Sequence, residues 1–205
     1  MMAQGRRGFI VLAGLSFLAG GRAFAVGIDQ VATPIASLQQ GLLTVMKAGK
    51  STPFEQRYNL LAPIIERVFD VPQILRASVG LTWSSIPPQQ QQALLQVFQR
   101  YTVATFVSNF DSYNGQRFNI SPQLRTVGND VVVDTQLVST DGTVHRLDYV
   151  MRQEGYSWKV VDVLSDGSIS QVATQRSDFV SVLRQGGAPA LIARLQQKVA
   201  NLSGG

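Results

Sequence analysis

The residues able to do acid–base or nucleophilic chemistry are few in this chain. His145 is the only histidine and there is no cysteine, so a histidine- or cysteine-based metal cluster and thiolate catalysis are excluded. The G-x-S-x-G, P-loop and G-x-G-x-x-G motifs are absent as well. His145 follows a predicted turn at Asp141-Gly142, which indicates an exposed imidazole rather than a catalytic base. We therefore expect no catalytic residues, no enzyme activity and no metal.

Three aspartates on predicted strands are the remaining acid–base candidates. Asp134 and Asp148 alternate with apolar neighbours, so both are expected on the opposite, solvated face of a sheet. Asp162 is separated from Trp158 and Val160 by an even number of positions, so all three share parity and are expected on one face of the strand, which indicates an interior position. It is the one candidate for a buried catalytic acid, and a buried carboxylate that accepts backbone hydrogen bonds is the structural alternative.

A run of strands from Asn129 to Leu164 positions these residues. Valine-rich segments divided by Asp141-Gly142 and Glu154-Gly155 predict consecutive β-hairpins, because glycine admits the positive φ that tight turns require. A further strand over 117–127, with Pro122 at an edge or a bulge, makes four antiparallel strands. One face of the sheet is apolar and needs a helical cover. The predicted fold class is therefore α+β.

About six segments show the apolar spacing of helices. Thr33-Pro34 and Thr52-Pro53 predict the starts of the first two, since threonine caps free amides and proline is tolerated at the first position. Pro63 is expected to kink or split the second helix, and Asp70 to cap the third. Gly186-Gly187 is expected to close the fifth helix. The expected ranges are about 33–49, 52–69, 70–80, 88–111, 169–185 and 189–199.

Residues 1–25 are expected to form a secretory signal peptide. Arg6-Arg7 supplies the positive region, 9–20 the apolar stretch and 23–25 the A-x-A cleavage signal. The stretch is too short for a membrane span, which needs ~20 apolar residues. The arginine pair also resembles a twin-arginine signal, but Sec export is favoured because no other element of that signal is present. Residues 26–205 then form a single domain.

Removing the signal peptide changes the charge balance. The formal net charge of +5 includes Arg6, Arg7 and Arg22, and residues 1–25 hold no acid, so the mature chain carries +2. No basic run remains that would form an electrostatic footprint for nucleic acid. An exported chain without cysteine has no disulfide and depends on its core for stability.

Several motifs carry a resemblance to a known family through their order and spacing. They are Phe69-Asp70-Val71-Pro72, Trp83-Ser84-Ser85-Ile86-Pro87-Pro88, Phe110-Asp111-Ser112-Tyr113-Asn114-Gly115, Trp158-Lys159-Val160-Val161-Asp162-Val163, and Arg176-Ser177-Asp178-Phe179 through Gly187. With these motifs the chain resembles the MlaC and toluene-tolerance (Ttg2-type) family of exported lipid-binding proteins. Within that family it is similar to the hopanoid-associated branch called HpnM.

The resemblance implies a periplasmic, monomeric lipid carrier with no catalytic motif and no cofactor beyond a bound lipid. Its fold would be an NTF2-like cone, in which helices wrap a twisted four-stranded sheet and leave an apolar cavity between the layers. The ligand would be a phospholipid or a hopanoid. The partners would be an inner-membrane transporter, either RND-type or an ABC/MCE complex, with an outer-membrane lipoprotein as a further candidate.

Such a cavity supplies affinity without polar contacts, because burying each methylene is worth ~0.8 kcal/mol. The helix over 72–80, with the connector at Trp83, is the expected moving part. We predict that the lining comes from the apolar stripes of the helices and the apolar face of the sheet. The predicted lining residues are Tyr58, Ile65, Phe69, Leu75, Trp83, Phe98, Tyr101, Val133, Leu147, Tyr149 and Trp158.

Two other classes of function stay open. One is an NTF2-like enzyme acting on a hydrophobic substrate, with Asp162 or a tyrosine as its acid or base. The other is a ligand-free adaptor subunit of a transport complex, whose interior is filled by its own side chains. An unfilled apolar space between the sheet and the helices distinguishes the carrier from the adaptor.

Overall fold

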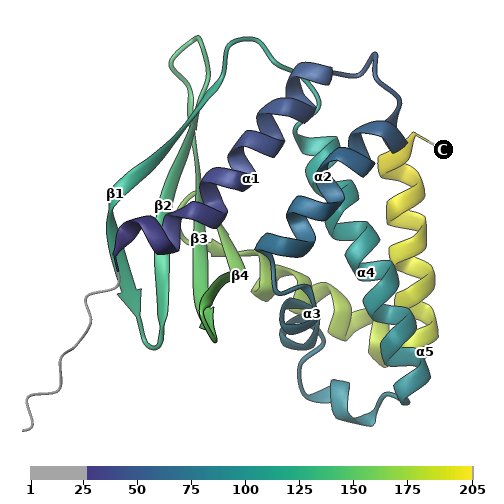
Figure 1. Ribbon diagram of the computed structural model, residues 1–205. Helices are drawn as coiled ribbons and strands as arrows, with labels where there is room; N and C mark the ends of the chain where they lie inside the picture. Colours follow the sequence, from purple (N-terminus) through teal and green to yellow (C-terminus); the bar gives the residue numbers. More distant parts are fainter. Residues whose placement is uncertain (1–26, 205) are drawn as a thin grey trace, which may run out of the picture.

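A layer of helices covers one face of an antiparallel sheet (Figure 1). The computed structural model describes residues 27–204, so the signal peptide predicted at residues 1–25 lies outside the described residues. The sheet has five strands in the order β1-β2-β3-β4-β5. The predicted α+β class is confirmed, and the predicted number of four strands is wrong.

The four long strands form the predicted meander. They are β1 (Arg117–Val127), β2 (Asp130–Val138), β3 (Val144–Glu154) and β4 (Ser157–Ser165). The additional strand, β5 (Ile169–Ser170), pairs with β4. Two residues are too few to show the alternation by which a strand is recognised, which is why β5 was not predicted.

Glycines and a proline end or distort the strands where the sequence predicted. Gly142 and Gly155 have φ of 86° and 58°, conformations that the two hairpin turns require of them. Pro122 lies between Ile120 and Leu124, where the register of β1 against β2 shifts. Because β1 is an edge strand of the sheet formed by the described residues, the proline removes no hydrogen bond from an inner strand.

The residues described contain five α-helices and one short 3-10 helix. The first helix begins at Ile28 rather than at Thr33-Pro34, and the Thr33 hydroxyl donates to the Asp29 carbonyl instead of capping. Pro63 does not split the second helix, whereas Asp70 caps the third through the Gln73 amide at 3.0 Å, as predicted. The helices are α1 (Ile28–Ala48), α2 (Phe54–Val68), α3 (Val71–Val79), η1 (Gly80–Ser85), α4 (Pro88–Asn109) and α5 (Gln171–Ser203).

The predicted break between the last two helices lies inside α5. Gly186 and Gly187 have non-helical backbone, with φ of −150° and 64°. The break redirects α5, whose C-terminal part runs alongside α4 (Figure 1). The two expected C-terminal helices are thus the two halves of one interrupted helix, which also begins later than expected because β5 occupies residues 169–170.

The face of the sheet that points away from the helices carries a buried carboxylate. Asp148 is 0% exposed, so the predicted solvated position is wrong for this residue. Guanidinium groups of Arg125 and Arg146 lie 3.0 and 2.8 Å from Asp148 Oδ2, and the Thr135 amide donates to Oδ1 at 3.2 Å. Alternation placed Asp148 on the correct face. It did not predict that long arginine side chains cover the carboxylate.

Asp134 belongs to the same network and remains partly exposed. Arg125 Nε donates to its Oδ1 at 2.8 Å, and this hydrogen bond lowers the pKa of Asp134 below its usual range. A carboxylate stabilised in this way contributes stability above the unfolded pKa, and that contribution is lost as the pH falls through the folded pKa.

We predict that Asp148→Asn lowers the free energy of unfolding by about 1–3 kcal/mol, because it removes the charge of a fully buried acceptor that Arg125, Arg146 and the Thr135 amide share. Glu55→Gln is the matched control. It breaks an exposed pair with Arg100, in which the side chains are 57% and 49% exposed, and is expected to lower the free energy by less than about 1 kcal/mol. Urea denaturation measures both. Equal losses in the two variants would show that the Asp148 network is no more than a surface ion pair.

Candidate functional site

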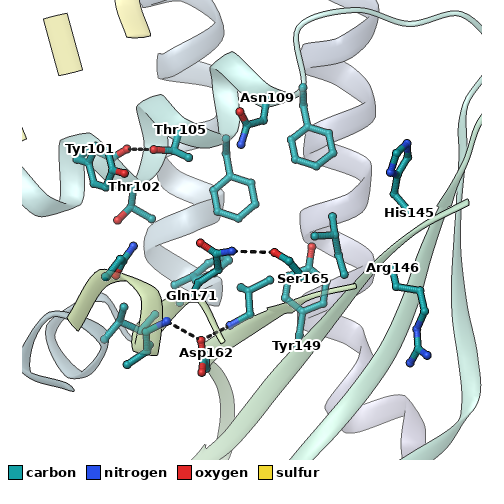
Figure 2. Close-up of a pocket in the computed structure, with 18 of the residues that line it drawn as sticks. Tyr101, Thr102, Thr105, Asn109, His145, Arg146, Tyr149, Asp162, Ser165 and Gln171 are labelled. Carbon is teal, nitrogen blue, oxygen red and sulfur yellow. Dashed lines mark hydrogen bonds between the residues drawn. The ribbon is translucent and has the colours of Figure 1, made fainter. Parts of the chain in front are cut away.

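A cavity of about 460 Å³ lies between the sheet and the helical layer (Figure 2). Its walls come mainly from α4, β3, β4 and the start of α5, and its volume falls within the ~300–1,000 Å³ usual for ligand pockets. Most of the wall is hydrocarbon. The apolar lining residues are Phe69, Ile74, Phe98, Phe106, Phe110, Leu137, Leu147, Val163 and Val172.

The polarity of the cavity changes along β3. His145, Leu147 and Tyr149 alternate onto the inner face of this strand and all line the cavity. His145 is exposed, as predicted, Leu147 is half-buried, and Tyr149 is 0% exposed. Asn109 and Asp166 are also exposed lining residues, so the mouth is polar, whereas most of the less exposed wall is apolar.

Asp162 lines the cavity, and its carboxylate is engaged in structural hydrogen bonds. It accepts from the amides of Val163 and Val172 at 2.8 and 3.1 Å (Figure 2). It also accepts from the Ser170 hydroxyl. Ser170 in turn caps α5 by accepting from the Ala173 amide at 2.9 Å. Asp162 thereby fastens the start of α5 to β4. This is the structural role that the sequence analysis gave as the alternative to a catalytic acid, a carboxylate that accepts backbone hydrogen bonds.

The parity assigned to Asp162 from the sequence fails at a bulge. Val150 pairs with Asp162, but Met151 pairs with Val160, so β4 has one extra residue between these two pairs. An extra residue reverses the alternation beyond it. The parity argument with Val160 therefore does not hold at Asp162, although the predicted interior position does, since Asp162 lines the cavity.

Five of the predicted lining residues lie on the cavity. They come from three different parts of the chain: the end of α2, the helix α4 and the strand β3. The residues are Phe69, Phe98, Tyr101, Leu147 and Tyr149. Their contact with a lipid remains a prediction.

The other six predicted residues lie elsewhere in the structure. Ile65, Leu75 and Val133 are 0% exposed and belong to the packed core. Trp158 is also buried in that core, while Tyr58 and Trp83 are half-buried and pack against it. A core position and a cavity position are both apolar at the same helical spacing, so the sequence pattern did not separate them.

Sequence reasoning missed part of the α4 wall. Phe106 and Phe110 widen the apolar stripe of α4, and this width was the available signal. Thr102 and Thr105 carried no such signal. Their hydroxyls donate to the carbonyls of Phe98 and Tyr101 at 2.9 and 2.8 Å, so neither offers a free donor to a ligand.

Within residues 27–204, no group of three or more histidine, aspartate or glutamate residues is placed to hold a metal ion. No helix in the same range is both long enough and apolar enough to cross a membrane.

Comparisons with known proteins place this fold in a family. The toluene tolerance protein Ttg2D of Pseudomonas putida is 25% identical over 131 residues, or 63% of this chain, and the chain spans 60% of that relative's length. A phospholipid-binding protein from Ralstonia solanacearum, solved in complex with a phospholipid, has a similar fold. Its TM-score is 0.73 at 23% identity, covering 85% of this chain and 99% of that one. A family model described as MlaC protein matches residues 36–197, from α1 to the second half of α5. Because this match covers more than half of the chain, the chain belongs to the MlaC family.

Proposed function

We propose that this protein is a periplasmic carrier that shields lipid tails in the cavity between its sheet and its helices. The observation that carries the proposal is the cavity itself, an unfilled space of about 460 Å³ with mainly apolar walls and a polar mouth. Tails that enter it leave water, and the polar head group stays near His145 and Asn109. The affinity then comes from buried hydrocarbon, and the shape of the cavity sets the specificity.

The cargo we propose is a phospholipid or a hopanoid. The phospholipid is supported by the similar structure from Ralstonia solanacearum, which holds a phospholipid. The hopanoid rests on the resemblance to the HpnM branch. As partners we propose an inner-membrane transporter, RND-type or ABC/MCE, and an outer-membrane lipoprotein, between which the carrier shuttles after export by the Sec route.

The two competing functions make different demands on the site. An enzyme would need an acid or base free to exchange protons with a substrate. Asp162, the carboxylate proposed for that role, instead accepts three hydrogen bonds that hold the start of α5. A ligand-free adaptor would have no use for an unfilled cavity, because empty space in a core lowers stability.

We predict that protein purified from its own cells carries a lipid. Native mass spectrometry under gentle conditions is expected to show a second species heavier by the mass of one lipid, and dissociation of that species identifies the cargo. An adaptor would show the mass of the chain alone.

We predict that Leu147→Arg weakens lipid binding by more than about tenfold, because the guanidinium occupies the cavity and is costly to bury among apolar groups. Val144→Arg on the same strand is the matched control, since Val144 is 48% exposed and is not a lining residue. Displacement of a fluorescent fatty acid measures both variants, and circular dichroism confirms that both fold. Binding that survives unchanged in Leu147→Arg would place the lipid elsewhere.

The helix α3 remains our proposed moving part. It contributes Ile74 to the cavity wall. Two hydrogen bonds connect it to α5: the Ser78 hydroxyl donates to Gln175 at 3.0 Å, and Arg176 donates to the Ala77 carbonyl at 2.8 Å. We predict that amide hydrogen exchange in α3 is faster than in α4 in the lipid-free protein and slows when lipid is bound. Equal protection of α3 in both states would assign the motion to another element.

A further inference from the structure

The Tyr149 side chain combines complete burial with an unpartnered hydroxyl. The residue is 0% exposed and lines the cavity from β3. No group within residues 27–204 forms a hydrogen bond with its hydroxyl. Buried polar side-chain atoms nearly always have a partner, so an isolated hydroxyl on a cavity wall points to an acceptor that enters the cavity.

The polar groups near Tyr149 are already paired with one another (Figure 2). Gln171 donates its side-chain amide to the Ser165 hydroxyl at 2.7 Å, and Asp162 accepts from Val163, Val172 and Ser170. The strand residues that pair with Tyr149, Val133 and Val163, have apolar side chains. Its immediate surroundings on the sheet thus supply no side-chain acceptor.

The Tyr149 hydroxyl is suited to donate a hydrogen bond and not to give up its proton. Burial raises the pKa of Tyr149 well above its usual range, so the phenol keeps its proton at physiological pH. A neutral phenol in an apolar wall forms a strong directional contact with an oxygen atom, and methylene groups cannot provide one.

We propose that the Tyr149 hydroxyl donates a hydrogen bond to an oxygen on the buried part of the bound lipid, the ester carbonyl of an acyl chain. This inference rests on the proposed carrier function. In this arrangement the head group lies at the mouth, near His145 and Asn109. The ester carbonyls connect the head group to the acyl tails, so they are the acceptors that enter the cavity first. Tyr149 thereby selects ester-linked lipids over purely hydrocarbon tails.

This role predicts opposite effects in the empty and the loaded protein. Without lipid no group of the described residues accepts a hydrogen bond from the buried hydroxyl, so its removal by Tyr149→Phe relieves an unfavourable burial and stabilises the empty protein. With an ester-linked lipid the same substitution removes a hydrogen bond. A hydroxyl with an ordinary structural role would give destabilisation of the empty protein.

The experiment compares wild-type protein, Tyr149→Phe and the control Tyr156→Phe after removal of bound lipid. Tyr156 is a fully exposed tyrosine in the turn between β3 and β4, so its variant removes a hydroxyl that water already solvates. The Tm of lipid-free Tyr149→Phe is expected to rise by about 2–4 °C. The Tm of Tyr156→Phe is expected to equal that of wild type.

Binding is measured with palmitoyl-oleoyl phosphatidylglycerol and with its dialkyl analogue, in which ether links replace both esters. Wild type is expected to bind the ester lipid about two- to tenfold more tightly than Tyr149→Phe does. The two proteins are expected to bind the ether analogue equally, because it has no carbonyl oxygen to accept the hydrogen bond.

Three results would overturn the inference, and they have different consequences. Equal binding of the ester lipid by wild type and Tyr149→Phe removes the role of the hydroxyl and leaves the carrier function intact. A Tm of the lipid-free variant at or below that of wild type shows that the hydroxyl has a partner in the empty protein. Failure of wild type to bind either lipid removes the carrier function and this inference with it.

Discussion

Keeping an apolar space open inside a folded chain is the physical constraint on this structure. Protein interiors are normally close-packed, and an unfilled space forfeits the dispersion contacts of the atoms around it. Here the loss is offset by a continuous core beside the cavity, where α1 and α2 pack against each other and against the sheet (Figure 1). Ile35 of α1 and Leu61 of α2 are both 0% exposed in this core. The fold therefore separates a packed region that supplies stability from a region that borders the cavity.

The sheet and the start of α5 are held by two carboxylates whose oxygens are paired with donors of the protein itself. On the outer face, Asp148 links three strands, because it binds Arg125 of β1 and the Thr135 amide of β2 from its own place on β3. At the other end of the wall, Asp162 of β4 fixes the start of α5 through Ser170 and the Val172 amide. Both carboxylates rigidify the frame of the cavity.

Local features of the fold follow from the sequence, and features set by tertiary contacts do not. The turn glycines, the Asp70 cap and the break at Gly186-Gly187 depend on residues adjacent in the chain, and the structure confirms them. The burial of Asp148 depends on arginine side chains from two strands, and the position of Asp162 depends on a bulge. Likewise the apolar stripe of α4 predicts its inner face, but only packing decides which residues border empty space.

The same α+β architecture is compatible with catalysis or carriage, so the groups on the cavity wall must decide between them. Hydrocarbon dominates this wall, and Asp162, the less exposed of its two carboxylates, already accepts three hydrogen bonds. Affinity drawn from buried methylenes grows with chain length and depends little on the head group. A carrier must nevertheless release its cargo, and release is aided when the empty state requires only modest rearrangement. In the proposed carrier the short helix α3 makes this rearrangement, while the sheet on the opposite side of the cavity stays fixed.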